Sequence, residues 1–225
     1  MNWHPDEQTA QAANQFPFPI HQQEPAPQPL GRNFIPASWN RRTIAQAWPA
    51  GPLRSDPERI IQLFRDAHYL EALAMTVSWG RMRKQAPIYD DRNLPDIERA
   101  LKQCAKSIQE TNEAQDAWLI LTGNQRQHLG WSAVMASKTL HFLSRALPDP
   151  VGQSPPVPRD GKVSLCYVWP GWIAHVPPPQ RPQNWKENTF EAYNRYMTAI
   201  LVWAGQRHWT TTQIETTIFH EGTMA

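Results

Sequence analysis

The chain has 225 residues, which is enough for one compact domain with a buried core and too few for two fused enzymes. Its 22 Lys and Arg against 20 Asp and Glu give a net charge of +2, so composition alone does not indicate a nucleic-acid-binding protein, and any basic surface must be local. No apolar run is long enough to span a bilayer, and the N-terminal segment lacks the basic start and apolar core of a signal peptide. We therefore expect a soluble, cytoplasmic protein with no membrane partner.

The cysteines and histidines do not form the patterns of metal or cofactor sites. Cys104 and Cys166 are the only two cysteines, which excludes a disulfide framework and a four-cysteine zinc or iron–sulfur site. The eight histidines never fall in an HExxH spacing, and there is no Walker loop or glycine-rich phosphate fingerprint. We expect neither a metal nor a cofactor.

The prolines organise the chain. Ten of the 22 lie within residues 5–57, and residues 1–38 mix them with Gln, Asn and Ala, a composition that buries too little apolar surface to offset the entropy of ordering. We predict that 1–38 is an extended arm, available to a protein partner, and that residues 39–225 form a domain that folds without it. Ten more prolines, within 148–182, separate two helical blocks.

The first block contains four predicted helices. Asp56 followed by Pro57 is typical of a helix start, and apolar residues then recur at helical spacing to Val77, which predicts one helix ending before Trp79. Similar spacing and end signals predict three more helices, at about 95–108, 113–123 and 137–147.

The second block follows the proline-rich stretch. A short helix is predicted from Gly161 toward Trp169. Asn188 and Glu191 form a plausible capping box for a long helix, and Thr212 with Glu215 repeats the pattern for a last one. Patterns typical of strands are almost absent, so we predict an all-α fold.

The most informative stretch is residues 130–172. A lysine, Lys138, lies at the start of a predicted helix, and an aspartate, Asp160, caps another helix after a Pro-x-Pro-x turn. This arrangement resembles the helix-hairpin-helix DNA glycosylases, specifically the 8-oxoguanine DNA glycosylase branch with its archaeal members, over about residues 55–221. The resemblance implies a helical fold with a cleft between two helical subdomains, Lys138 and Asp160 as catalytic residues, and double-stranded DNA containing a damaged base as the partner.

The chemistry of the two residues is consistent with those roles. The positive end of a helix dipole and partial burial would favour the neutral, nucleophilic amine of Lys138. Its attack on the sugar C1′ would expel the base and leave a Schiff base, whose β-elimination nicks the strand. Asp160 could accept the lysine proton or stabilise positive charge on the sugar. The alternative is a solvated lysine and a plain helix cap.

A base must leave the duplex before an enzyme can reach C1′, so the site needs aromatic walls and a polar reader. The last predicted helix resembles the family's last helix, which implies that Phe219 stacks on the flipped base and that Glu215, one turn earlier, reads its edge. Trp79 is a candidate for the opposite wall. For each aromatic residue the alternative interpretation is core packing.

The hairpin before the lysine departs from the family pattern. Its usual Gly-x-Gly lets backbone N–H groups approach a phosphate, whereas residues 134–137 here are Val, Met, Ala and Ser. Phosphate binding must therefore be weaker or use other groups. The candidates for contacts with the DNA backbone are Asn124, Arg126, His128 and Ser137.

The resemblance implies a bifunctional DNA glycosylase and abasic-site lyase, that is, a hydrolase and lyase of base excision repair that removes an oxidised purine such as 8-oxoguanine. The alternative is a non-catalytic or repurposed member of the same fold that binds a nucleic acid or a modified base, for example in bacterial anti-phage defence. The altered hairpin and the arm favour the alternative, whereas retention of both Lys138 and Asp160 favours the enzyme. We expect a monomer.

Overall fold

The structure, a computed structural model, describes residues 4–15, 24–25, 32–34, 53–79, 94–111, 113–123, 129, 131–147 and 189–224. This part of the chain contains eight helices, α1 (Glu7–Gln15), α2 (Pro57–Arg65), α3 (Tyr69–Trp79), α4 (Leu94–Glu110), α5 (Ala114–Thr122), α6 (Ala133–Ala146), α9 (Phe190–Arg207) and α10 (Thr211–Met224). A single antiparallel ribbon joins β1 (Arg32–Phe34) to β2 (Leu53–Ser55), each three residues long. The prediction of an all-α fold is confirmed, because this ribbon is too short to form a layer.

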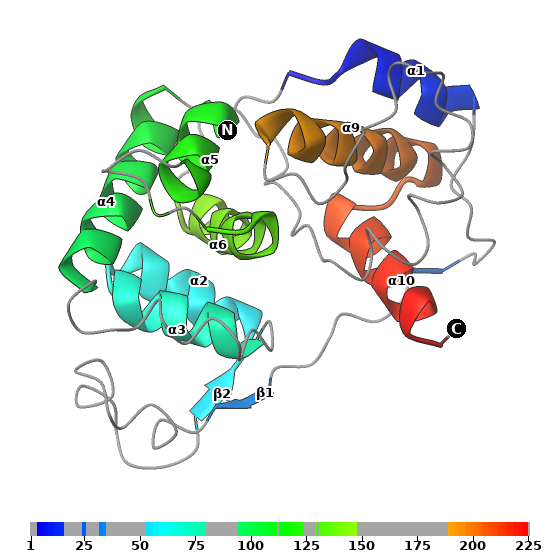
Figure 1. Ribbon diagram of the computed structural model, residues 1–225. Helices are drawn as coiled ribbons and strands as arrows, with labels where there is room; N and C mark the ends of the chain where they lie inside the picture. The colour runs from blue at the N-terminus through cyan, green and yellow to red at the C-terminus, as the bar shows by residue number, and fades with distance from the viewer. Residues whose placement is uncertain are drawn as a thin grey trace.

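The helices gather in two groups (Figure 1). In the first, α6 packs against α2, α3 and α5, and α4 packs against α5; in the second, α9 lies between α1 and α10. The groups meet where α5 contacts α9, and there the rings of Trp118 and Tyr193 stack with centroids 4.2 Å apart and planes at 14°. Both rings are fully buried, so this contact belongs to the core. The described residues do not define a cleft between the groups, so that cleft stays a prediction.

The helix that we predicted from Pro57 to Val77 is two helices, and that prediction was wrong. The break is at Ala67, whose φ of 61° is left-handed. The N–H of Ala67 donates to the Phe64 carbonyl, and the N–H of His68 donates to the Leu63 carbonyl, which together form a Schellman end for α2. Glycine usually occupies this left-handed position, so the alanine gave no signal of a break.

The left-handed conformation of Ala67 leads to a prediction about the free energy of unfolding. Because Ala67 is exposed and holds a conformation that alanine disfavours, we expect Ala67→Gly to raise the free energy of unfolding by about 0.5–1 kcal/mol. The converse change, Gly205→Ala in α9, should also stabilise, because a Cβ there would meet no atom within 4 Å. Urea unfolding of both variants checks this, and a loss of stability in Ala67→Gly would contradict the assigned turn.

The N-terminal stretch is not wholly extended as predicted, because residues 7–15 are helical. Asp6 caps this helix with a carboxylate that accepts from the N–H of Thr9 at 3.0 Å, and the nine residues of α1 include no proline. The helix packs on α9, with Ala13 fully buried. Hydrogen bonds join them from the Asp6 N–H to the Thr198 hydroxyl at 3.0 Å, and from Gln206 Nε2 to the Ala13 carbonyl at 3.4 Å and to Asn14 Oδ1 at 3.5 Å.

These contacts predict the effect of removing the helix. The domain boundary at residue 38 stays a prediction, and we still expect a chain without residues 1–15 to fold. We expect its free energy of unfolding to fall by about 1–3 kcal/mol, because the apolar surface of α9 beneath α1 becomes exposed.

Two substitutions distinguish the loss of the contact between α1 and α9 from the effect of shortening the chain. Ala13→Asp places a charge at the buried contact and should cost as much as the deletion, whereas Gln11→Asp, on the exposed side of α1, should cost much less. Thermal unfolding of all three proteins gives the comparison. A deletion that leaves the midpoint unchanged would show that α1 does not dock in solution.

The capping residues differ from those predicted for the last two helices. Thr189, not Asn188, caps α9, accepting from the Ala192 N–H at 3.2 Å. Thr210 caps α10 and forms a capping box with Gln213, whose Oε1 accepts from the Thr210 N–H at 2.7 Å. The predicted box of Thr212 and Glu215 is therefore wrong by two residues. The short helix predicted at 161–169 lies outside the described residues.

Candidate functional site

The helix that carries Lys138 begins earlier than we predicted. Ser132 caps α6 by accepting from the Met135 N–H at 3.4 Å, so the helix starts at Ala133 and not near Ser137. Lys138 is therefore in the second turn. The helix dipole acts mainly within the first turn, so it contributes less at Lys138 than the sequence suggested. The Lys138 side chain is buried, with only 4% of its surface exposed.

The segment that we took for an altered hairpin is helical. Residues 134–137 form the first turns of α6, and the connection from α5 to α6 is residues 123–132. Beyond Gly123, two N–H groups in its described part donate to α5, from Leu129 to the Ile120 carbonyl at 3.2 Å and from Trp131 to the Leu121 carbonyl at 2.8 Å. Comparing residues 134–137 with Gly-x-Gly was therefore misplaced.

The ionisable side chains of α6 share one face. They are Lys138, His141 and Arg145, and spacings of three and four residues bring helical positions to the same side. Lys138 and His141 are 4% and 3% exposed, whereas Arg145 is partly exposed and pairs with Glu58 of α2 at 3.7 Å. Val134, on the same face at its other end, is also partly exposed. Along this face, the buried Lys138 thus lies between two partly exposed residues, Val134 and Arg145.

Aromatic rings lie beside this face. Trp79, the last residue of α3, is partly buried, and its ring meets Phe142 edge-on, with centroids 5.1 Å apart and planes at 87°. Phe142 lies one turn beyond Lys138, so the structure brings Trp79 to the helix of the lysine. Phe142 in turn meets the ring of His141 at 5.1 Å. The sequence did not single out Phe142 or His141, because their spacing of four and three residues from Lys138 is also that of ordinary core packing.

The predicted base-reading residues lie on α10. Glu215 is 9% exposed, and the capping role that the sequence suggested for it is taken by Gln213. Phe219 follows one turn later in the same helix, and its side chain lies outside the described part of the structure. The roles of Glu215 and Phe219 at a flipped base stay predictions.

Four of the other predicted site residues lie outside the described residues: Asn124, Arg126, His128 and Asp160. The first three belong to the connection between α5 and α6. Ser137 is described: it is fully buried, and its hydroxyl donates to the Val134 carbonyl at 3.3 Å. The described contacts therefore give no support to a DNA contact by Ser137.

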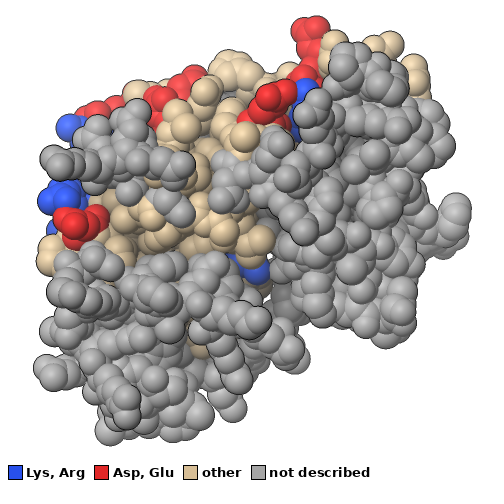
Figure 2. All heavy atoms as spheres, viewed as in Figure 1, with Lys and Arg blue, Asp and Glu red and all other residues tan. Residues whose placement is uncertain are grey.

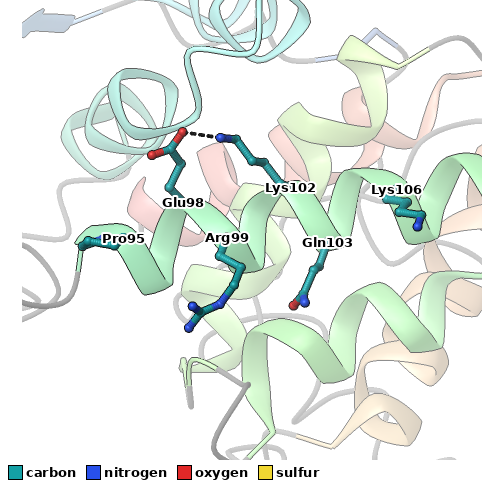
Figure 3. Close-up of a pocket in the computed structure, with 6 residues that line it drawn as sticks. All are labelled: Pro95, Glu98, Arg99, Lys102, Gln103 and Lys106. Atoms are coloured by element: carbon teal, nitrogen blue, oxygen red, sulfur yellow. Dashed lines mark ion pairs between the residues drawn. The ribbon is translucent and has the colours of Figure 1, made fainter.

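A surface pocket lies along α4 (Figure 3) and is lined by Pro95, Glu98, Arg99, Lys102, Gln103 and Lys106. Its cations pair with acidic residues of the same helix, Lys102 with Glu98 at 2.6 Å and Lys106 with Glu110 at 3.6 Å. Such exposed pairs neutralise each other, so the pocket is a poor phosphate site. On the face in Figure 2, the described basic and acidic atoms are also interspersed.

The remaining described side chains do not suggest a second nucleophile or a metal site. Burial raises the pKa of the Cys104 thiol far above its usual range, because the thiolate would be desolvated, so Cys104 is not a nucleophile. Within the described ranges, no three His, Cys, Asp or Glu side chains gather as metal ligands. In the same residues, no helix combines the length and apolar character needed to cross a membrane.

The fold and these contacts define an all-helical protein whose central helix carries a buried lysine beside aromatic rings. Residues 26–219 match the model of the family described as "Putative 8-oxoguanine DNA glycosylase OGG-like protein". The match spans most of the chain, so the chain belongs to this OGG-like family, and the resemblance drawn from the sequence is confirmed. No curated protein and no solved structure matches the chain in the corresponding comparisons.

Proposed function

We propose that this protein is a DNA glycosylase with abasic-site lyase activity that removes an oxidised purine, such as 8-oxoguanine, from double-stranded DNA. The observation that carries the proposal is the burial of Lys138, 4% exposed, on the face of α6 that holds the other ionisable side chains of the helix. Burying a lysine costs free energy, because its ammonium group loses its hydration. A buried lysine therefore indicates a role for the side chain. Membership of the OGG-like family supports this reaction class.

The proposed reaction uses the amine as the nucleophile. The damaged base leaves the duplex, and Trp79 with Phe219 provides faces on which it stacks, while Glu215 reads its edge. Nζ of Lys138 attacks C1′, and the base leaves with the electron pair of its bond to C1′ and takes up one proton of the amine. The C1′–O4′ bond of the sugar ring then opens, O4′ takes a proton from solvent, and an iminium joins C1′ to Nζ. Asp160 stabilises the positive charge that develops on the sugar. β-Elimination then cleaves the strand on the 3′ side, and water releases the lysine.

The test is release of the free base. The protein is incubated with a duplex that contains one 8-oxoguanine, and with a matched duplex that contains guanine, and free base is measured by chromatography. We expect release from the lesion duplex only. Preferential binding of the lesion duplex without release would favour the alternative, a non-catalytic OGG-like protein that binds a modified base. Neither release nor preference would contradict both.

A further inference from the structure

We infer that His141 is a catalytic residue of the lyase step, the general base that removes the C2′ proton of the iminium formed on Lys138. The inference rests on the proposed function and extends it to a residue that the reaction described above does not use. It starts from the surroundings of Lys138 on α6.

The first observation is position. His141 follows Lys138 by three residues in an unbroken helix, and such pairs have Cβ atoms about 5–6 Å apart. A sugar joined to Nζ of Lys138 would therefore lie within reach of the imidazole. Arg145, the third ionisable side chain on this face, pairs with Glu58 and is a guanidinium, which cannot act as a base near neutral pH.

The second observation is burial. His141 is 3% exposed and lies edge-on to the Phe142 ring, which itself meets Trp79. The other histidines whose side chains are described, His4, His68 and His208, are exposed, so His141 differs from them in its surroundings. An imidazole packed against the Phe142 ring is oriented, and an oriented base within reach of its proton is what general base catalysis requires.

The chemical step balances without any further reagent. The imidazole nitrogen takes the C2′ proton, and the C2′–H electron pair flows toward the iminium to give an enamine. Its collapse forms the C2′=C3′ bond and breaks the C3′–O bond, and the phosphate leaves with that electron pair. Water then hydrolyses the conjugated iminium and frees Lys138, and the imidazolium returns its proton to solvent.

The experiment uses DNA that already contains an abasic site, so that it does not depend on base recognition. Two readouts are compared for the full-length protein and for His141→Gln: borohydride trapping, which reports iminium formation, and strand nicking, which reports elimination. We expect trapping within about twofold of wild type and nicking lowered by about 10²-fold or more. His68→Gln, at an exposed histidine, should leave both unchanged.

A second variant tests the role of the ring itself. In His141→Ala, added imidazole should restore part of the nicking, which a purely structural role would not allow. Equal nicking by wild type and His141→Gln would overturn the inference, as would a parallel loss of trapping and nicking in both variants. If wild type traps abasic DNA but releases no 8-oxoguanine, the proposed base removal fails while the inference is still tested. If wild type traps nothing, both fail.

Discussion

Replacing Lys138 by glutamine is expected to abolish the trapping of DNA and to lower base release by about 10³-fold or more, because the amine of Lys138 is the nucleophile of the proposed reaction. Lys138 lies in the interior of α6, and glutamine is as good a helix former as lysine. Helix content should therefore remain, and the unfolding midpoint should change little compared with the loss of activity. Single-turnover kinetics on the lesion duplex, with circular dichroism in parallel, measures both.

The matched control is Lys106→Gln, at an exposed lysine of α4 that pairs with Glu110. It removes the same charge and should leave base release and trapping unchanged, because exposed pairs contribute little. Persistent trapping by Lys138→Gln would show that another amine performs the reaction. A Lys138→Gln protein that has lost its helix content would instead assign the lysine a structural role.

Asp160→Asn is expected to slow base release by about 10²–10⁴-fold while DNA binding is retained. An amide still caps a helix, but it neither accepts a proton nor carries a charge that stabilises the sugar cation. Binding and turnover should thus separate in this variant. Affinity for the lesion duplex and the rate of base release, measured at one salt concentration, test the separation, since phosphate contacts make binding salt-dependent.

A suitable comparison is Asp116→Asn, at an exposed aspartate in the first turn of α5. It makes the same chemical change away from the proposed site and should leave both quantities near the wild-type values. Equal turnover in Asp160→Asn and wild type would reduce Asp160 to a structural cap. Loss of binding together with turnover would place it at the DNA contact.

Sequence periodicity predicted the helices whose apolar stripes are regular. The stripe in α4 includes Ile97, Leu101, Cys104 and Ile108, all buried as the spacing requires. The break at Ala67 was missed because neither glycine nor proline marks it. Helix α1 was missed for a different reason: the prolines around it indicated an extended arm, although residues 7–15 contain none and suit a helix.

The sequence predicted the central residue of the candidate site, Lys138, but not the residues around it. The resemblance pointed to Lys138, and in the structure that residue is buried on α6, the helix that packs against α2, α3 and α5. The predicted start of α6 was wrong. The comparison of residues 134–137 with Gly-x-Gly placed the helix start near Ser137, whereas Ser132 is the cap and Lys138 lies in the second turn. His141 and Phe142 were missed because a buried ring has the same sequence pattern as ordinary core packing. Only tertiary contacts, such as that between Phe142 and Trp79, distinguish the two.

The measurement that tests the central claim most directly is identification of the residue joined to DNA after borohydride reduction. The full-length protein is reduced in the presence of a duplex that contains 8-oxoguanine, digested, and the peptide that carries the sugar remnant is sequenced by mass spectrometry. We expect one modified peptide, with the remnant on Nζ of Lys138. No modified peptide under conditions in which free base is released, or a remnant on any other amine, would contradict it.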